Sequence, residues 1–390
     1  MGVFEEELRA RLAALEAENL LRRLRRIDRP QRPQTMVNGR AVQNFSSNDY
    51  LGLATHQKLR QTAEKALRDF GTGSGASRLI CGSLAPHHAL EEALAEFKGV
   101  ERALVFSSGY ATAIGTIAAL VGSGDIVVID KLVHASIIDG ARLSGAKLRV
   151  FDHNDLNDLE AILKWADAQR GGGKSQVLVV TESLFSMDGD RAPLRELVEL
   201  KDRYGAWLMV DEAHATGLFG EKRRGLIEEA GVSGRVEVQM GTLGKALGSA
   251  GGYIAGPAVL IDYLVNRARS FVFSTAPPPS VSASASAAIE VVRSKEGAGL
   301  VEKLRDNINQ FAGETDTQIP SQHSPILLKL IGPEIEAVRV AQEMFEGGFL
   351  VPAIRYPTVA RGKARLRFTF SAAHTWEDVS ALSACVRELL

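Results

Sequence analysis

Two apolar runs decide the fold: Val177-Leu-Val-Val-Thr181 and Trp207-Leu-Met-Val-Asp211, with a helical pattern between them. Runs of this length and composition are typical of strands that are buried on both faces of a parallel sheet. Four more runs of the same kind occur along the chain and alternate with helical patterns: 103–106, 126–130, 148–152 and 236–240. This alternation predicts an α/β fold with a mainly parallel central sheet.

Polar residues follow these runs where each predicted strand ends. Ligands of parallel sheets bind beyond the carboxyl ends of the strands, so we expect these residues to lie near one another. They are His134, then Glu182, Ser186 and Asp188, then Asp211 and His214, and finally Lys245. The segment Ser107-Ser-Gly-Tyr-Ala-Thr112 also ends a strand and opens a helix, whose first N–H groups suit a phosphate.

One lysine lies in a glycine-rich stretch, Val238-Gln-Met-Gly-Thr-Leu-Gly-Lys-Ala-Leu-Gly-Ser-Ala-Gly-Gly-Tyr253, whose nearest preceding acid is Glu237. The small neighbours of Lys245 leave room for a flat ligand to approach the backbone. The alternative is a lysine that merely caps a glycine-rich turn. The functional interpretation is an amine that forms an imine with an aldehyde.

Lys245, Asp211, His214 and His134 together predict a site for pyridoxal phosphate. The lysine would hold the aldehyde, and a carboxylate facing the ring nitrogen would keep that nitrogen protonated so that the ring accepts electrons. One imidazole would hydrogen-bond the phenolic oxygen, and the other would stack on the ring. Each histidine taken alone could be a structural residue, but the occurrence of all four residues at one predicted sheet edge favours cofactor binding.

A second hypothesis is an ATPase, because Leu208-Met-Val-Asp-Glu-Ala-His214 resembles an acidic strand end and Arg170-Gly-Gly-Gly-Lys-Ser175 precedes it. A phosphate loop needs a glycine where Ala168 stands, and it needs a preceding strand. Phe70-Gly-Thr-Gly-Ser-Gly-Ala-Ser77 similarly follows a helical pattern rather than the strand that a dinucleotide fingerprint requires. Neither stretch therefore lies after a predicted strand, as its motif requires.

Composition and net charge indicate which kinds of partner this protein would bind. The 390 residues carry a formal net charge of -1, which does not favour nucleic acid or an anionic membrane surface. Cys81 and Cys385 have no metal-site or disulfide spacing, so no metal is expected. The first residues are acidic, unlike a signal peptide, and no apolar run reaches the roughly 18 residues of a membrane span. We expect a cytoplasmic enzyme that acts on small molecules.

The chain divides into three expected parts. Residues 1–45 are predicted as a helical arm, over 4–27, and a short strand; residues 46–280 as the large cofactor-binding domain; and residues 281–390 as a small α+β domain after a triple proline. The small domain has predicted strands at 326–330, 350–354 and 365–370 and predicted helices at 334–346 and 375–389. Alternation places Arg365 and Arg367 on one face of the last strand, either to bind a carboxylate or to face solvent.

Five stretches resemble the α-oxoamine synthases, a family of fold-type I pyridoxal-phosphate enzymes, over nearly the whole chain. They are Phe45-Ser-Ser-Asn-Asp-Tyr-Leu-Gly52, Gly73-Ser-Gly-Ala-Ser77, Thr181-Glu-Ser-Leu-Phe-Ser-Met-Asp-Gly189, Val210-Asp-Glu-Ala-His214 and Gly241-Thr-Leu-Gly-Lys245. Phe273-Ser-Thr-Ala-Pro-Pro-Pro279 and Ile354-Arg-Tyr-Pro-Thr-Val359, with Arg365-Leu-Arg367 and Ala372-Ala-His-Thr375, most resemble the members that act in biotin biosynthesis. The chain departs from relatives at Tyr356 and Ala360, where they commonly have proline.

The resemblance implies a role for each matching residue. Lys245 is implied as the imine lysine, Asp211 as the partner of the ring nitrogen, His214 and Ser186 as contacts to the ring oxygen, and His134 as the stacking residue. Gly109, Tyr110 and Thr242 would hold the phosphate, with Ser274 and Thr275 reaching it from a second subunit of a homodimer. Asn48 and Arg367 would bind the amino-acid carboxylate, and Arg22 and Thr358 would line the acyl side, with His134 also near substrate.

The activity implied by the resemblance is a decarboxylative condensation of L-alanine with pimeloyl-CoA or pimeloyl acyl carrier protein. It releases carbon dioxide and the free thiol. The alternatives within the family are glycine C-acetyltransferase, which uses glycine and acetyl-CoA, and other α-oxoamine synthases. All of them would use the same cofactor residues.

Overall fold

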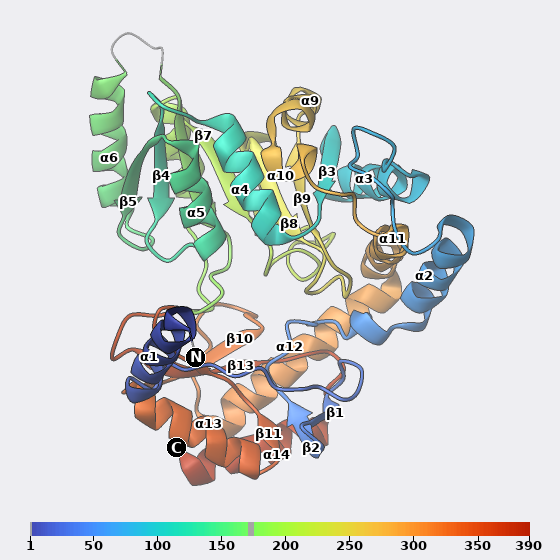
Figure 1. Cartoon of the computed structure of the whole chain (residues 1–390), viewed down its shortest axis with the longest axis vertical. Helices are drawn as coiled ribbons and strands as arrows, with labels where there is room; N and C mark the ends of the chain where they lie inside the picture. The colour runs from blue at the N-terminus through green and yellow to red at the C-terminus, as the bar shows by residue number, and fades with distance from the viewer. Residues whose placement is uncertain (1, 171–174) are drawn as a thin grey trace. The chain divides into compact units, whose positions relative to one another are not determined.

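The computed structural model describes residues 2–170 and 175–390, which form two compact units (Figure 1). The larger unit comprises Leu51–Ser186 and Asp190–Val301, and the smaller unit comprises Met1–Tyr50, Met187–Gly189 and Glu302–Leu390. The units thus divide the chain at other positions than residues 45 and 280, and the three expected domains remain a prediction.

The larger unit is built on a seven-stranded sheet in the order β3-β9-β8-β7-β6-β4-β5. Its strands are β3 (Arg102–Phe106), β4 (Ile126–Asp130), β5 (Lys147–Phe151), β6 (Val177–Glu182), β7 (Trp207–Asp211), β8 (Val238–Thr242) and β9 (Gly252–Gly256). Strands β5, β4, β6, β7 and β8 run parallel, whereas β9 is antiparallel to both of its neighbours. The six predicted strands and the mainly parallel sheet are confirmed, within two residues at each end.

Helices surround this sheet, and β4 and β6 are buried along their full length, as their continuous apolar sequences predict. The helices are α2 (Gln57–Phe70), α3 (Ala85–Lys98), α4 (Gly109–Leu120), α5 (Ala135–Ser144), α6 (Leu156–Gln169), α7 (Leu194–Arg203), α8 (Leu226–Glu229), α9 (Ala258–Arg267), α10 (Arg269–Val272) and α11 (Pro279–Arg293), with short 3-10 turns η1 (Leu53–Thr55) and η2 (Ser233–Arg235). Helix α12 (Lys295–Thr315) contains the division between the units.

The strand ends position the site. Asp130, Glu182, Asp211 and Thr242 are the last residues of β4, β6, β7 and β8, and these strands are neighbours in the sheet. Glu182 and Asp211 are direct partners in the register of β6 and β7. Four polar side chains therefore lie along one edge, and two of them, Glu182 and Asp211, are among the residues expected there.

The smaller unit contains two three-stranded sheets, in the orders β1-β2-β11 and β10-β13-β12. Its strands are β1 (Gln34–Val37), β2 (Arg40–Asn44), β10 (Ile326–Gly332), β11 (Phe349–Leu350), β12 (Ala353–Ile354) and β13 (Ala364–Thr369), and its helices are α1 (Val3–Ala17), α13 (Glu334–Glu346) and α14 (Trp376–Leu389). Strand β13 lies between two others, and Arg367 on it is only 5% exposed. The solvent-facing alternative for this arginine is therefore wrong.

The predicted N-terminal helix is correct at its start and wrong at its end. Helix α1 ends at Ala17, because Asn19 takes a left-handed conformation with φ 58 and the N–H groups of Leu20 and Leu21 both donate to the Leu15 carbonyl. The leucines after Ala17 continue the helical spacing, so the sequence predicted a longer helix. Leu20 is buried, however, whereas no residue of α1 is buried. Arg22 consequently lies on a non-helical segment.

Candidate active site

Two neighbouring carboxyl groups occupy the centre of the strand-end edge in the larger unit. Asp211 is 6% exposed, and its Oδ1 accepts a hydrogen bond of 2.8 Å from the Ala213 N–H. Glu182 is 2% exposed, and its Oε1 accepts a hydrogen bond of 2.5 Å from the His134 N–H. The Glu182 carboxyl therefore fixes the position of His134, a link that the sequence did not reveal.

Burial and neighbouring charges shift the pKa values of both carboxyl groups. Burial raises the pKa of Glu182 to about 8, and the charge of Asp211 adds to this shift. Burial also raises the pKa of Asp211, but the positive charge of Lys245 opposes the shift. Glu182 thus favours its protonated form at neutral pH, and Lys245 is the largest influence that favours the ionised form of Asp211. Such a carboxylate suits a protonated ring nitrogen.

His134 is held at the start of α5. Its Nδ1 lies 2.8 Å from the Ser136 hydroxyl and accepts a hydrogen bond of 3.2 Å from the Ser136 N–H. Burial lowers the pKa of His134, and Lys245 contributes to this, while Asp211 opposes it. The imidazole is therefore neutral at neutral pH and restrained at one edge, as a ring that stacks on a flat cofactor requires.

The residues predicted for the phosphate meet at the start of α4. The Ser108 hydroxyl caps the helix by accepting a hydrogen bond of 3.0 Å from the Ala111 N–H. A Cβ atom added to Gly109 would lie 2.6 Å from Thr242 Cγ2, so Gly109 and Thr242 are in contact. Among the described residues, the buried Thr242 hydroxyl has no hydrogen-bond partner. An orphaned hydroxyl beside a helix N-terminus fits a phosphate group.

Tyr110, Ser186 and His214 also belong to the larger unit. Tyr110 is exposed, and its hydroxyl donates a hydrogen bond of 2.5 Å to Asp139. Ser186 and His214 are both buried and follow β6 and β7 in the chain. Their burial near the strand ends agrees with contacts to the polar edge of a cofactor ring, which remain a prediction.

The segment that contains Ser274 and Thr275 is held by the glycine-rich loop of residues 71–77. Thr275 forms a β-bridge with Ser77, and the Ala276 N–H donates to the Ala76 carbonyl at 3.0 Å. The Pro277 carbonyl accepts hydrogen bonds from the Ser74 hydroxyl at 2.6 Å and from His87 Nε2 at 2.8 Å. The loop that failed as a dinucleotide motif therefore positions the predicted phosphate-contacting segment.

A histidine between two carboxylates supports the same edge and was missed in the sequence. His153 Nδ1 lies 3.0 Å from Asp130, and its Nε2 lies 2.7 Å from Asp190. Burial favours the neutral ring, but the two carboxylates prevail and raise the pKa of His153 to about 10. Asp130 also accepts from the Leu132 N–H at 2.7 Å, and the His153 ring meets Phe185 edge-on at 4.4 Å. The cluster thus joins the segments that carry His134 and Ser186.

Replacing His153 with glutamine is expected to lower the free energy of unfolding by about 2 kcal/mol near pH 6, because charge-assisted hydrogen bonds are lost. The folded-state pKa of His153 is raised, so its contribution is complete below about pH 6.5 and is lost as the pH rises through about 10. Urea unfolding at both ends of this range measures the gap between variant and parent. His88→Gln, at an exposed histidine, is the control. A gap that does not shrink with pH would contradict a charged His153.

Two predicted substrate residues meet in the smaller unit. Arg367 Nη1 donates to Asn48 Oδ1 at 3.2 Å and to the Thr369 hydroxyl at 3.1 Å, although Asn48 and Arg367 are 319 positions apart. The Tyr50 hydroxyl also donates to Asn48 Oδ1, at 3.4 Å. Burial raises the pKa of Tyr50 to about 12, although the Arg367 charge lowers it. The result is a fixed, buried guanidinium, which suits a carboxylate ligand.

The other predicted pair, Arg22 and Thr358, is also brought together in the smaller unit. Arg22 Nη2 donates to the Tyr356 carbonyl at 3.2 Å, and the Thr358 N–H donates to the Arg355 carbonyl at 3.0 Å. Arg355 Nη2 in turn donates to the Leu21 carbonyl at 2.7 Å. The residues assigned to the acyl side therefore lie in one cluster.

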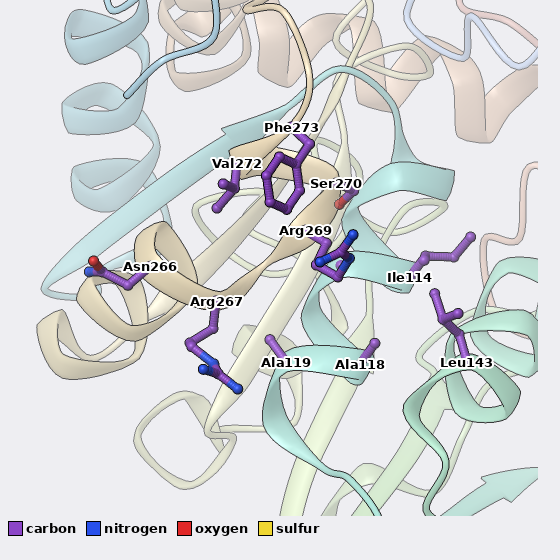
Figure 2. A pocket seen from close by; sticks show the side chains of 11 residues that line it. Ile114, Ala118, Ala119, Leu143, Asn266, Arg267, Arg269, Ser270, Val272 and Phe273 are labelled. Atoms are coloured by element: carbon purple, nitrogen blue, oxygen red, sulfur yellow. The ribbon is translucent and has the colours of Figure 1, made fainter. Parts of the chain in front are cut away.

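A hollow of about 400 Å³ lies elsewhere in the larger unit (Figure 2). Its lining comes from α4, α5, α9 and α10 and includes Ile114, Leu143, Arg267, Arg269 and Phe273. No residue predicted for the cofactor or the substrate is part of this lining. The hollow is therefore separate from the strand-end site.

The structure of residues 2–170 and 175–390 bears on the membrane and metal predictions. No helix in those ranges is long and apolar enough to cross a membrane. The same ranges contain no group of three or more His, Cys, Asp or Glu side chains arranged to hold a metal ion. Residues 171–174, which belong to the phosphate-loop motif of the ATPase hypothesis, lie outside the described residues.

A mainly parallel sheet with a lysine, a buried aspartate and two histidines after its strands defines a fold-type I pyridoxal-phosphate enzyme. The model of the aminotransferase class I and II family matches residues 40–384, so the chain belongs to this family.

Comparisons with individual proteins agree with this class. The chain is 46% identical, over 96% of both chains, to an 8-amino-7-oxononanoate synthase of Geobacter sulfurreducens. A serine palmitoyltransferase structure from S. paucimobilis with bound PLP has a TM-score of 0.92 and 27% identity, covering 100% of this chain and 98% of that one. An 8-amino-7-oxononanoate synthase structure from Francisella tularensis has a TM-score of 0.74 and 29% identity, covering 89% and 97%. The cofactor is pyridoxal phosphate.

Proposed function

We propose that this protein is a pyridoxal-phosphate-dependent acyltransferase that condenses L-alanine with a pimeloyl thioester. The products are 8-amino-7-oxononanoate, carbon dioxide and the free thiol, a step of biotin biosynthesis. The observation that carries the proposal is the 46% identity, over nearly the full length of both chains, to a relative of that name. The cytoplasm remains the expected location.

The cofactor residues have separate tasks in this proposal. When bound, pyridoxal phosphate supplies an electron sink that makes the α-carbon of an amino acid acidic. Lys245 would bond the cofactor and, once displaced by alanine, would remove the α-proton with its amine. Asp211 would hold a proton at the ring nitrogen, and His134 would cover the ring face. Thr242 and the first turn of α4 would bind the phosphate.

The substrate residues would orient both reactants. Arg367, held by Asn48, would bind the alanine carboxylate that leaves as carbon dioxide. Arg22 and Thr358 would line the acyl side. His134 or His214 would donate to the thioester carbonyl as charge develops on its oxygen. The attacking carbon and the carbonyl would thereby be oriented before the new bond forms.

A second subunit is also part of the proposal. Ser274 and Thr275 are expected to reach the phosphate of the partner subunit, which makes the enzyme a homodimer with shared sites. Support comes from the bonds that hold this segment, from Ser74 and His87 to the Pro277 carbonyl. A segment restrained in this way presents its hydroxyls in a defined position.

The test is a thiol-release assay that crosses several amino acids with several acyl thioesters. We expect the highest kcat/KM with alanine and pimeloyl-CoA or pimeloyl acyl carrier protein. An alanine-dependent product with the mass of 8-amino-7-oxononanoate confirms the reaction. Faster release with glycine and acetyl-CoA would instead assign glycine C-acetyltransferase and leave the cofactor site unchanged.

A further inference from the structure

Glu212 is the second residue of the stretch Asp211-Glu-Ala-His214, and the proposed reaction gives it no task. Asp211 precedes it as the last residue of β7, and His214 follows two positions later. Glu212 is 0% exposed, and its carboxylate forms an ion pair with Lys98, the last residue of α3, which is 2% exposed. A buried ion pair is therefore built into the segment that carries two residues assigned to the cofactor ring.

Both oxygens of the Glu212 carboxylate have partners. Oε2 accepts from Lys98 Nζ, and Oε1 accepts from the Ile227 N–H at 2.8 Å. Lys98 Nζ also donates to the Arg224 carbonyl at 2.6 Å. A Cβ atom added to Gly225 would lie 2.4 Å from each carboxylate oxygen, so the backbone there packs closely against them. The pair therefore ties the end of β7 to the end of α3 and to the start of α8.

The backbone of Glu212 holds the same segment. Its N–H donates to the Met240 carbonyl of β8 at 2.8 Å. Its carbonyl accepts from the N–H groups of Ala215 and Thr216, both at 2.9 Å, and these two bonds close a turn. His214 lies within this turn, so a shift of Glu212 would move the histidine together with the strand end.

Stability alone does not account for a buried ion pair at this position. Burial lowers the pKa of Lys98, but the charge and the hydrogen bond of Glu212 outweigh this effect and raise it, so Lys98 stays charged. Removing two charges from water is so unfavourable that well-packed apolar residues of similar volume are often at least as stable. Hydrogen bonds to a carboxylate have defined directions, which apolar contacts lack. The pair is thus suited to fixing the position of the strand end.

We propose that Glu212 is a positioning residue for the cofactor site and acts through its ion pair with Lys98. It fixes the end of β7 and the following turn, so that Asp211 faces the ring nitrogen and His214 faces the ring oxygen. This inference rests on the proposed function for the roles of Asp211 and His214. Displacing a group in an active site by about 1 Å can lower a rate about 100-fold, so a restraint of this kind affects the chemistry.

The experiment uses the cofactor-loaded enzyme and removes both charges together in the variant Lys98→Met/Glu212→Gln. Because no unpaired charge is left buried, this variant should still fold and bind the cofactor. We expect exchange of the alanine α-proton in deuterated solvent to slow about 30-fold. The KM for alanine should change less than about 3-fold, because Arg367 still binds the carboxylate. Lys98→Met alone is a second variant, since a buried Glu212 can take up a proton and keep its bond to Ile227.

The visible absorption of the bound cofactor gives a readout that does not depend on turnover. A proton held at the ring nitrogen by Asp211 disfavours a second positive charge on the nitrogen that joins Lys245 to the cofactor. A displaced Asp211 holds the ring proton less well, so the pH midpoint of the absorption change should rise by about one unit in both variants. A midpoint or an exchange rate equal to that of the parent would overturn the inference and leave the ion pair purely structural.

Lys201 and Glu237 provide the matched control, because they form a lysine–glutamate pair at the other ends of the same strands. Lys201 is 5% exposed and pairs with Glu237, which precedes β8. Glu237 Oε2 also accepts from the Leu208 N–H, near the start of β7, at 2.8 Å. Lys201→Met/Glu237→Gln should leave the exchange rate and the absorption midpoint unchanged. Equal effects from the two double variants would show a general loosening of the sheet and reject the positioning role.

The inference and the proposed function can fail separately. The absorption midpoint tests the ion pair with the cofactor alone, without an acyl donor. A parent enzyme that does not condense alanine with a pimeloyl thioester, but whose midpoint shifts in both variants, would reject the proposed reaction and retain Glu212 as the positioning residue.

Discussion

Replacing Lys245 with alanine is expected to abolish turnover, by about 10⁴-fold or more, while pyridoxal phosphate still binds. Two functions are lost together, namely the covalent bond to the cofactor and the amine that removes the α-proton. Binding persists because the phosphate and ring residues, among them Thr242 and Asp211, are unchanged. Thiol release measures the turnover, and visible absorption with equilibrium dialysis measures the bound cofactor.

Borohydride reduction followed by peptide mass analysis locates the covalent bond. In the cofactor-loaded parent, the peptide that contains Lys245 should carry the added mass. Lys222→Ala, at an exposed lysine, is the matched control and should retain both turnover and the modified peptide. An unmodified Lys245 peptide from fully loaded parent enzyme would remove this lysine from the chemistry.

Replacing Asp211 with asparagine is expected to leave the cofactor bound but to slow exchange of the alanine α-proton about 10³-fold. An amide at the end of β7 cannot hold a proton at the ring nitrogen, so the charge of the carbanion is no longer accepted by the ring. Exchange is measured by the loss of the alanine α-proton signal in deuterated solvent, without any acyl donor. Unchanged exchange would show that Asp211 is only structural.

Glu182→Gln is the matched control, because Glu182 is the register partner of Asp211 on the neighbouring strand. Burial raises the pKa of Glu182 to about 8, so its carboxyl is already neutral at neutral pH and an amide resembles it. Its oxygen still accepts from the His134 N–H. We expect exchange to remain within about 10-fold of the parent.

Local sequence patterns predicted six strands of the large sheet but not the seventh, β9. The six predicted runs are apolar and separated by helical patterns, so each could be assigned from its own residues. Strand β9 was not predicted because it begins and ends with glycine and follows a glycine-rich stretch. The end of α1 was missed because a left-handed Asn19, and not a loss of helical spacing, terminates the helix.

The candidate site likewise contains residues that the sequence predicted and residues that it did not. Lys245, Asp211 and the start of α4 follow directly from the rule that parallel strands end at one edge, so their order along the chain was informative. Glu182 and the His153 cluster were not assigned roles, because their partners lie far away in the sequence. His153 bonds to Asp130 and Asp190, which are 23 and 37 positions away. No local pattern marks a histidine of this kind.

The sequence by itself determined the class of fold, the cofactor and the order of the candidate cofactor residues along one sheet edge, because apolar periodicity and strand-end position are local properties. Only the tertiary structure decided which distant side chains meet. Arg367 contacts Asn48 across 319 positions, and Arg22 reaches the Tyr356 carbonyl across 334. Such contacts, and the pKa shifts that accompany them, depend on burial and on neighbouring charges, which exist only once the chain has folded.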